Sequence, residues 1–122
     1  MILVDTSVWI DHLRLGDDGL VRQLEAGRVV LHPFILGELA LGTLRNRHTV
    51  LELLGLLPRA VVAADEEVMG LIEREGLHGI GIGFIDAHLL AATRLTVGAR
   101  LWTRDKRLDR AALRLSLSAG FA

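Results

Sequence analysis

Three acidic residues lie far from any other charged residue along the chain. Asp5 is the single Asp, Glu, Lys or Arg among the first ten residues, Glu38 the single one between positions 29 and 44, and Asp86 the single one between positions 76 and 93. Asp105 is a fourth candidate because, like Asp5, it follows a short apolar segment. A carboxylate in apolar surroundings needs a cation or water as its partner, or it stays protonated. These four acids are therefore the residues most able to do chemistry together.

Helix capping is the simpler role for three of them. Asp5 and Asp105 precede predicted helices and Asp86 lies in the first turn of one, where a carboxylate contributes on the order of 1 kcal/mol to stability. Glu38 has no such role, because it lies beyond the first turn of a helix that is otherwise apolar and expected to be largely buried. Capping and site chemistry both stay open for the other three acids.

A divalent metal ion would be a shared partner for all four carboxylates. Mg²⁺ and Mn²⁺ prefer carboxylate and water oxygens, and clustered acids repel one another until such an ion binds. The chain has no cysteine, which excludes zinc-thiolate and iron–sulfur sites. Acids around Mg²⁺ are typical of phosphodiester hydrolysis, because the metal lowers the pKa of water. We therefore predict a Mg²⁺ (or Mn²⁺) site formed by Asp5, Glu38, Asp86 and Asp105.

Short apolar strands alternating with helices must position these acids. The 122 residues, 51% of them hydrophobic, are expected to form one domain over positions 1–122. The alternation predicts an α/β fold with a mostly parallel central sheet of about five strands and helices on both faces. Such sheets bind ligands beyond the carboxyl ends of their strands, where Asp5 and Asp105 are expected. Strands are predicted at 2–4, 28–32, 60–63, 101–102 and 113–117, and helices at 7–14, 18–26, 33–44, 46–56, 65–75, 84–95 and 105–112.

Other conspicuous residues carry no recognisable site pattern. Glycines at positions 76, 79, 81 and 83 match neither GxGxxG nor GxxxxGK, so this loop is expected to let the chain turn before Asp86. The five histidines lack metal-ligand spacing, and Trp9 and Trp102 are expected to pack in the core.

Four motifs around the candidate acids occur in order along the chain. They are Val4-Asp5-Thr6-Ser7-Val8-Trp9-Ile10, Glu38-Leu39-Ala40-Leu41-Gly42, Asp86-Ala87-His88-Leu89-Leu90-Ala91-Ala92 and Thr103-Arg104-Asp105. Taken together, they resemble the motifs of the PIN-domain ribonucleases, and more narrowly those of the VapC-type toxins of VapBC toxin–antitoxin pairs. The resemblance extends from position 2 to about position 108, and the ordered set is specific although each part alone is weak.

The resemblance implies a PIN-like fold and a metal-dependent endoribonuclease that hydrolyses RNA with a metal-activated water. It further implies a homodimer and a cognate VapB-type antitoxin that covers the site. By position, Asp5 and Asp86 would be the principal metal ligands, and Glu38 and Asp105 would complete the acidic cluster. Ser7 and Thr103 would be supporting hydroxyl groups.

Basic residues gather near the end of the chain, although the formal net charge is -1. Seven basic residues and two acids lie between Arg94 and Arg114. Two interpretations stay open: a solvated arginine-bearing face, and a surface that holds the RNA backbone beside the acidic pocket. The RNA-binding candidates are Arg45, Arg47, Arg94, Arg104, Lys106 and Arg107.

Four leucines around the first two helices have two possible roles. Leu13, Leu15, Leu20 and Leu24 could line a groove for an antitoxin helix, or they could belong to the core. No run without Asp, Glu, Lys or Arg exceeds ten residues, too short to cross a bilayer. The first residues do not resemble a secretory leader, so we expect a cytoplasmic protein with no membrane partner.

Two other functions deserve comparison with the nuclease. A receiver-like phospho-acceptor domain usually has paired acids after its first strand and a Lys after a late strand, whereas Asp5 has no acidic neighbour and Lys106 follows Asp105 directly. A metal-bound RNA adaptor that does not cleave its ligand fits the same residues, and only an RNA cleavage assay distinguishes it from a nuclease.

Overall fold

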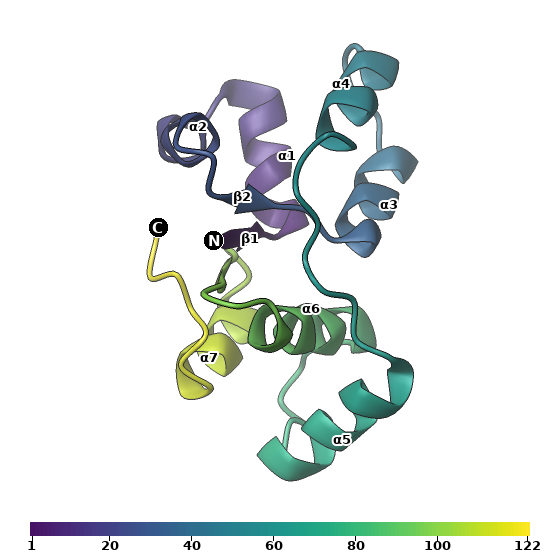
Figure 1. Ribbon diagram of the computed structural model, residues 1–122, viewed down its shortest axis with the longest axis vertical. Coiled ribbons are helices and arrows are strands. Elements are labelled where there is room, and N and C mark those ends of the chain that lie inside the picture. The colour runs from purple at the N-terminus through teal and green to yellow at the C-terminus, as the bar shows by residue number, and fades with distance from the viewer.

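A three-stranded parallel sheet lies between two groups of helices in the computed structural model, which describes residues 1–122 (Figure 1). The strand order is β2-β1-β3, so the first strand is central. Helices α1 to α4 lie on one side of the sheet and α5 to α7 on the other. The strands are β1 (Ile2–Val4), β2 (Val29–Val30) and β3 (Arg100–Trp102); the helices are α1 (Thr6–Leu15), α2 (Asp18–Glu25), α3 (Pro33–Leu41), α4 (Arg47–Leu54), α5 (Asp65–Glu75), α6 (Phe84–Leu95) and α7 (Lys106–Arg114).

The predicted fold class is confirmed, but the expected number of strands is wrong. The segments 60–63 and 113–117 form no strands. Instead, Arg59 makes a single parallel bridge with Leu31, and Ser118 makes one with Leu101. These bridges extend the sheet at both edges, so the two outer positions of a five-stranded sheet are present only as isolated bridges.

The misplaced last strand has a simple physical reason. Leucines at positions 113, 115 and 117 alternate as in a half-buried strand. The chain instead continues α7 to Arg114, because Leu108, Ala111 and Ala112 are buried at helical spacing. Leu113 is exposed on the outer face of that helix. The helical spacing of the buried residues therefore determines the local structure, and the alternation of the leucines does not.

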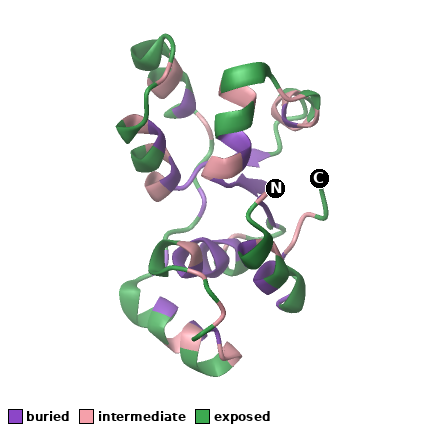
Figure 2. Ribbon diagram, turned by 180° about the vertical axis from the view of Figure 1, so that it is seen from behind, coloured by how far each residue is buried: buried purple, intermediate pink, exposed green.

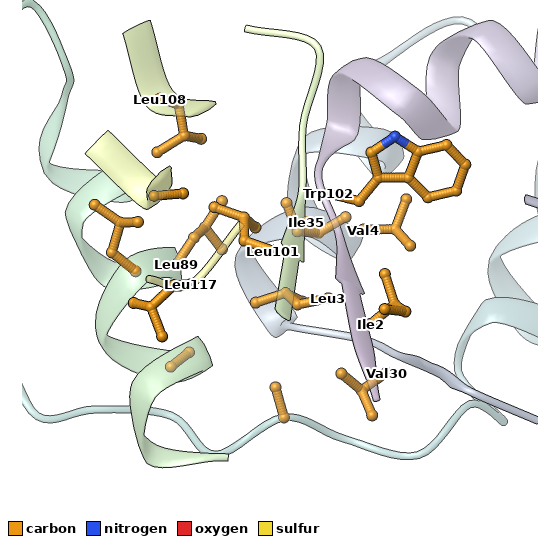
Figure 3. Close-up of a cluster of buried hydrophobic side chains, with 14 of the residues drawn as sticks. Ile2, Leu3, Val4, Val30, Ile35, Leu89, Leu101, Trp102, Leu108 and Leu117 are labelled. Atoms are coloured by element: carbon orange, nitrogen blue, oxygen red, sulfur yellow. The ribbon is translucent and has the colours of Figure 1, made fainter. Parts of the chain in front are cut away.

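Both faces of the sheet carry buried apolar side chains. Leu3 and Leu101 point toward α6, where Leu89 lies, whereas Val4 and Trp102 point to the opposite face (Figure 3). All five side chains belong to one cluster of 29 buried apolar residues. Covering both faces satisfies the usual requirement of a parallel sheet.

Helices α6 and α3, which carry two of the predicted site acids, differ in burial. Every residue of α6 from Ala87 to Thr93 is buried (Figure 2). In α3 only Ile35 and Leu39 are buried, and Leu41 is 91% exposed. The prediction of a largely buried third helix is therefore wrong, because α3 presents one side to α1 and α4 and the other to solvent. None of the seven helices combines the length and apolar character needed to cross a bilayer.

Parallel pairing of β1 with β3 brings two of the predicted motifs together. Val4 pairs with Trp102, so the residues that follow them, Asp5 and Thr103, leave the sheet at the same edge. The backbone N–H of Asp5 donates to the carbonyl oxygen of Trp102 over 2.9 Å. The carboxyl ends of the two strands thus place residues about a hundred positions apart in one site.

Candidate functional site

Asp5 is a buried carboxylate held by two hydroxyl groups. The residue is only 8% exposed. Oδ2 accepts a hydrogen bond from Ser7 Oγ over 2.8 Å and another from Thr103 Oγ1 over 2.7 Å. Asp5 also occupies the N-cap position of α1, yet its side chain makes no capping hydrogen bond. The capping interpretation of Asp5 therefore fails, and its carboxylate is oriented by the strand ends instead.

The directions of these hydrogen bonds are fixed by two backbone amides. Ser7 Oγ accepts from the N–H of Arg104 over 3.0 Å, and Thr103 Oγ1 accepts from the N–H of Asp105 over 3.1 Å. Each hydroxyl has one proton and directs it toward Asp5. Both protons are therefore directed at the same oxygen, Oδ2, which fixes the orientation of the carboxylate.

Glu38 is attached to the same edge by a single contact. Its Oε1 accepts a hydrogen bond from Thr6 Oγ1 over 2.8 Å, and Thr6 directly follows Asp5. Glu38 itself is exposed, contrary to the buried environment expected for it.

The helix that carries Glu38 is capped by a histidine. At the start of α3, Nδ1 of the buried His32 accepts from the N–H of Phe34 over 3.0 Å. Burial, and then the charge of His88, lower the pKa of His32 to about 4, so it remains a neutral acceptor that caps the helix.

The pKa of Asp86 is raised by burial and by the charges of two other candidate site acids. Its Oδ2 accepts from the N–H of Gly83 over 3.1 Å, which caps α6. Burial raises the pKa of Asp86 above its ordinary value, the Gly83 hydrogen bond opposes this shift, and the negative charges of Asp5 and Asp105 raise the pKa further. The capping interpretation of Asp86 thus holds.

Asp105 caps α7 with one of its two oxygens. Oδ1 accepts from the N–H of Arg107 over 2.9 Å and from the N–H of Leu108 over 3.0 Å. These are the orphan amides of the first helical turn. The capping interpretation of Asp105 therefore holds for Oδ1, and Oδ2 accepts no hydrogen bond within the chain.

A common pattern joins the four acids. Each uses one oxygen to accept from the protein, and the other oxygen has no donor within the chain: Asp5 Oδ1, Glu38 Oε2, Asp86 Oδ1 and Asp105 Oδ2 are the free ones. Carboxylate oxygens are the ligands that Mg²⁺ and Mn²⁺ prefer, so the donor set fits such an ion. No group of three or more acidic or histidine side chains is arranged so that it could hold a metal ion.

Comparison with known proteins decides the family. The family model described as PIN domain matches residues 2–113. The chain belongs to the PIN domain family. It is also 50% identical over 111 residues to ribonuclease VapC32 of Mycobacterium tuberculosis, from strains CDC 1551 / Oshkosh and H37Rv, covering 91% of this chain and 90% of the relative. The predicted resemblance to VapC-type PIN domains is therefore confirmed.

A solved structure is similar to this PIN domain in fold. The crystal structure of FitAcB from Neisseria gonorrhoeae superposes with a TM-score of 0.62 at 22% sequence identity. The match covers 92% of this chain and 93% of that one. At this identity the likeness supports the arrangement of the elements and no more.

Three of the six predicted RNA-binding residues are engaged within the PIN domain. Arg47 donates from Nε and Nη2 to the carbonyl oxygen of Ala40 over 3.1 and 2.7 Å, and Arg94 pairs with Glu75 over 3.2 Å. Arg104 is the third engaged residue and makes the most extensive set of contacts. The remaining three, Arg45, Lys106 and Arg107, make no side-chain hydrogen bond or ion pair in the structure.

Arg104 joins the site to the first two helices. Its guanidinium pairs with Asp11 over 2.8 Å and with Asp17, and it lies 5.5 Å from the ring centre of Trp102. The hydrogen bond from Arg104 is the main reason that the pKa of Asp17 is lowered. Since the backbone N–H of Arg104 also holds Ser7, this residue fixes the loop that carries Thr103 and Asp105.

Thr6 could not be identified as a site residue from the sequence. It lies inside the first motif, but nothing in the sequence indicates that its hydroxyl group reaches Glu38, 32 positions away.

A buried histidine connects two helices. His88 Nε2 lies 2.9 Å from Asp65 Oδ1, which links α6 to α5. Of the histidines, His32 caps α3 and His88 contacts Asp65.

An apolar groove opens beside Glu38. Its volume is about 480 Å³, and Glu38, Arg14 and Arg45 border it. Its apolar lining consists of Ile10, Leu13, Leu15, Leu39 and Leu44. The four leucines singled out in the sequence therefore divide: Leu13 and Leu15 line the groove, Leu20 is fully buried, and Leu24 is half-buried against the core.

Proposed function

We propose that this PIN domain is a metal-dependent endoribonuclease, the toxin component of a type II toxin–antitoxin pair, which hydrolyses phosphodiester bonds of RNA in the cytoplasm. The observation that carries the proposal is the set of four carboxylates with free oxygens around the carboxyl ends of β1 and β3. The 50% identity to a protein named ribonuclease VapC32 supports the same reaction.

In this proposal, Asp5, Glu38, Asp86 and Asp105 hold a Mg²⁺ or Mn²⁺ ion. When bound, the ion supplies positive charge that stabilises the reacting phosphate and lowers the pKa of the attacking water. Ser7 and Thr103 hold Asp5 in one orientation through Oδ2, and Oδ1 accepts no hydrogen bond within the chain. Asp86 gains most from the ion, because its charged form is disfavoured by burial and by its acidic neighbours.

The proposed partners of the domain are RNA and a VapB-type antitoxin. In this proposal, Arg45, Lys106 and Arg107, whose side chains have no partner within the chain, would contact the RNA backbone. An amphipathic antitoxin helix in the groove of about 480 Å³ would bury Leu13 and Leu15 and cover Glu38 at the same time. Exposed apolar side chains elsewhere, among them Ile85 and Val97, are candidates for a homodimer interface, which light scattering of the purified protein tests.

The decisive experiment incubates purified protein with RNA. We expect cleavage with Mg²⁺ or Mn²⁺, none with EDTA, and none by the Asp5→Asn variant, because that variant loses one charge from the metal site while keeping the shape of the side chain. Binding of RNA without cleavage under all conditions would favour the non-cleaving adaptor. Growth arrest on expression in cells, relieved by the cognate antitoxin gene, tests the toxin role separately.

A further inference from the structure

The side chain of Arg107 lies directly against Gly81 of the glycine-rich loop. A Cβ atom added to Gly81 would lie 2.8 Å from Arg107 Cδ and 3.0 Å from Arg107 Nη1, closer than real Cβ contacts. Gly81 also has a φ of +85°, a conformation that favours glycine. Glycine at this position therefore makes room for the arginine, a purpose beyond turning the chain.

The positive charge of Arg107 has no partner in the protein. The five close ion pairs of the structure, all with nitrogen to oxygen distances of 4.0 Å or less, involve Arg94, Arg104 and two histidines, but not Arg107. Its guanidinium makes no hydrogen bond within the chain, although its backbone N–H binds Asp105. The residue is exposed. Its charge is therefore available to an anion from solution.

The contact between Arg107 and Gly81 joins the two segments that carry Asp86 and Asp105. Arg107 lies two residues after Asp105, and Gly81 lies five residues before Asp86 on the loop that leads into α6. The backbone N–H groups of Ile80, Gly81 and Ile82 donate to no acceptor in the protein. A cation and three free amide donors thus lie in the two segments that carry Asp86 and Asp105.

We propose that Arg107, positioned by Gly81, binds a phosphate of the RNA backbone next to the bond that is cleaved. RNA approaching four carboxylates is repelled, and a guanidinium at the edge of the cluster offsets this by binding two phosphate oxygens with its planar fork. Arg107 is a binding residue for the substrate, and Gly81 is a positioning residue that acts through it. This inference rests on the proposed ribonuclease function.

Four variants separate the contact from general effects on the loop. Arg107→Ala removes the charge, and Arg107→Lys keeps the charge without the fork. Gly81→Ala displaces Arg107 and strains the backbone. Gly79→Ala is the matched control, because Gly79 also has a positive φ, +72°, but nothing lies within 4 Å of its added Cβ. Thermal unfolding of each variant shows whether it folds, and the two Arg107 variants test the proposal even where a glycine variant does not fold.

The measurement is cleavage of a short single-stranded RNA oligonucleotide at several salt concentrations. For Arg107→Ala we expect KM to rise about fivefold with little change in kcat, and the slope of log affinity against log salt to fall by about 0.7, the loss of one phosphate contact. Arg107→Lys recovers part of both losses. Gly81→Ala raises KM in the same direction, whereas Gly79→Ala leaves KM and the salt slope near those of the unmodified protein.

Two results overturn the inference while leaving the proposed function intact. One is a wild-type KM and salt slope in Arg107→Ala; the other is an equal rise of KM in Gly79→Ala and Gly81→Ala, which would assign the effect to backbone strain. Failure of the unmodified protein to cleave RNA counts against the proposed function instead. In that case, fluorescence anisotropy with the same RNA in EDTA measures binding alone, and the same variants decide whether Arg107 contacts the phosphate.

Discussion

Asp5 and Glu38 carry the same charge at the same edge of the sheet, but the protein holds them differently. Asp5 is buried and accepts two hydroxyl hydrogen bonds whose donors are themselves held by backbone amides. Glu38 is exposed and is held by one hydroxyl from Thr6. The site therefore has a rigid part at the strand ends and an adjustable part on α3, and the adjustable part lies beside the groove proposed for a partner.

Replacing Asp5 tests the rigid part with the largest effect. Asp5→Asn keeps the size of the side chain but removes a charge from the proposed metal site, so we expect cleavage to fall by at least about a hundredfold. Far-ultraviolet circular dichroism is expected to show the unmodified fold. Activity close to that of the unmodified protein would show that Asp5 is a structural residue at a strand end and no more.

Removing the hydroxyl of Thr103 tests the support of Asp5. Thr103→Val keeps the buried shape but leaves Asp5 with one hydroxyl donor and the N–H of Asp105 without its acceptor. We expect cleavage to fall about ten- to a hundredfold and unfolding in urea to show a loss of about 1–2 kcal/mol. Thr103→Ser, which retains the hydroxyl group, is the matched control and is expected to recover most of the activity.

The raised pKa of Asp86 predicts a pH dependence of stability without metal. A carboxyl whose folded pKa lies above its ordinary value of 3.8 stabilises the fold below that value, and this contribution is lost as the pH rises through the raised pKa. Thermal melts in EDTA should therefore show that Asp86→Asn gains stability over the unmodified protein as the pH increases toward neutrality. Mg²⁺ should reduce this difference. A difference that does not vary with pH would contradict the raised pKa of Asp86, which is caused mainly by burial.

The smallest effect is expected on the adjustable part. Thr6→Val removes the contact to Glu38, but both residues border solvent, so stability is expected to change by less than about 0.5 kcal/mol. Cleavage should fall only a few-fold, because Glu38 can reach the ion through other rotamers. A loss as large as that of Thr103→Val in parallel assays would mean that the α3 side of the site is as rigid as the strand ends.

The neighbouring positions of two candidate site acids could be predicted from the sequence, whereas the outer strands of the sheet could not. Asp5 and Asp105 could be placed together because parallel strands end at one edge, and that logic needs no knowledge of side-chain packing. The strand expected at 113–117 failed because alternating leucines do not distinguish a strand from the end of an amphipathic helix. The exposure of Glu38 could not be foreseen, since it depends on how α3 packs between α1 and α4.

Arginine roles also escaped prediction from the sequence. Arg104 was predicted to face RNA because of its basic neighbours, whereas its guanidinium pairs with Asp11 and Asp17. Both partners lie more than 85 positions away in the chain, so only the folded arrangement reveals them. Arg107, in contrast, keeps a free charge. The sequence alone indicates only that Gly81, the glycine that accommodates Arg107, belongs to a turn.

In the proposed nuclease, acids from separate elements share one kind of inorganic cation. Anomalous scattering from a crystal soaked in Mn²⁺ tests this sharing most directly. We expect a strong peak in contact with the free oxygens of Asp5 and Asp86, with Glu38 and Asp105 facing it directly or through water. A structure at saturating Mn²⁺ with no peak there, or with one bound elsewhere, would contradict the claim.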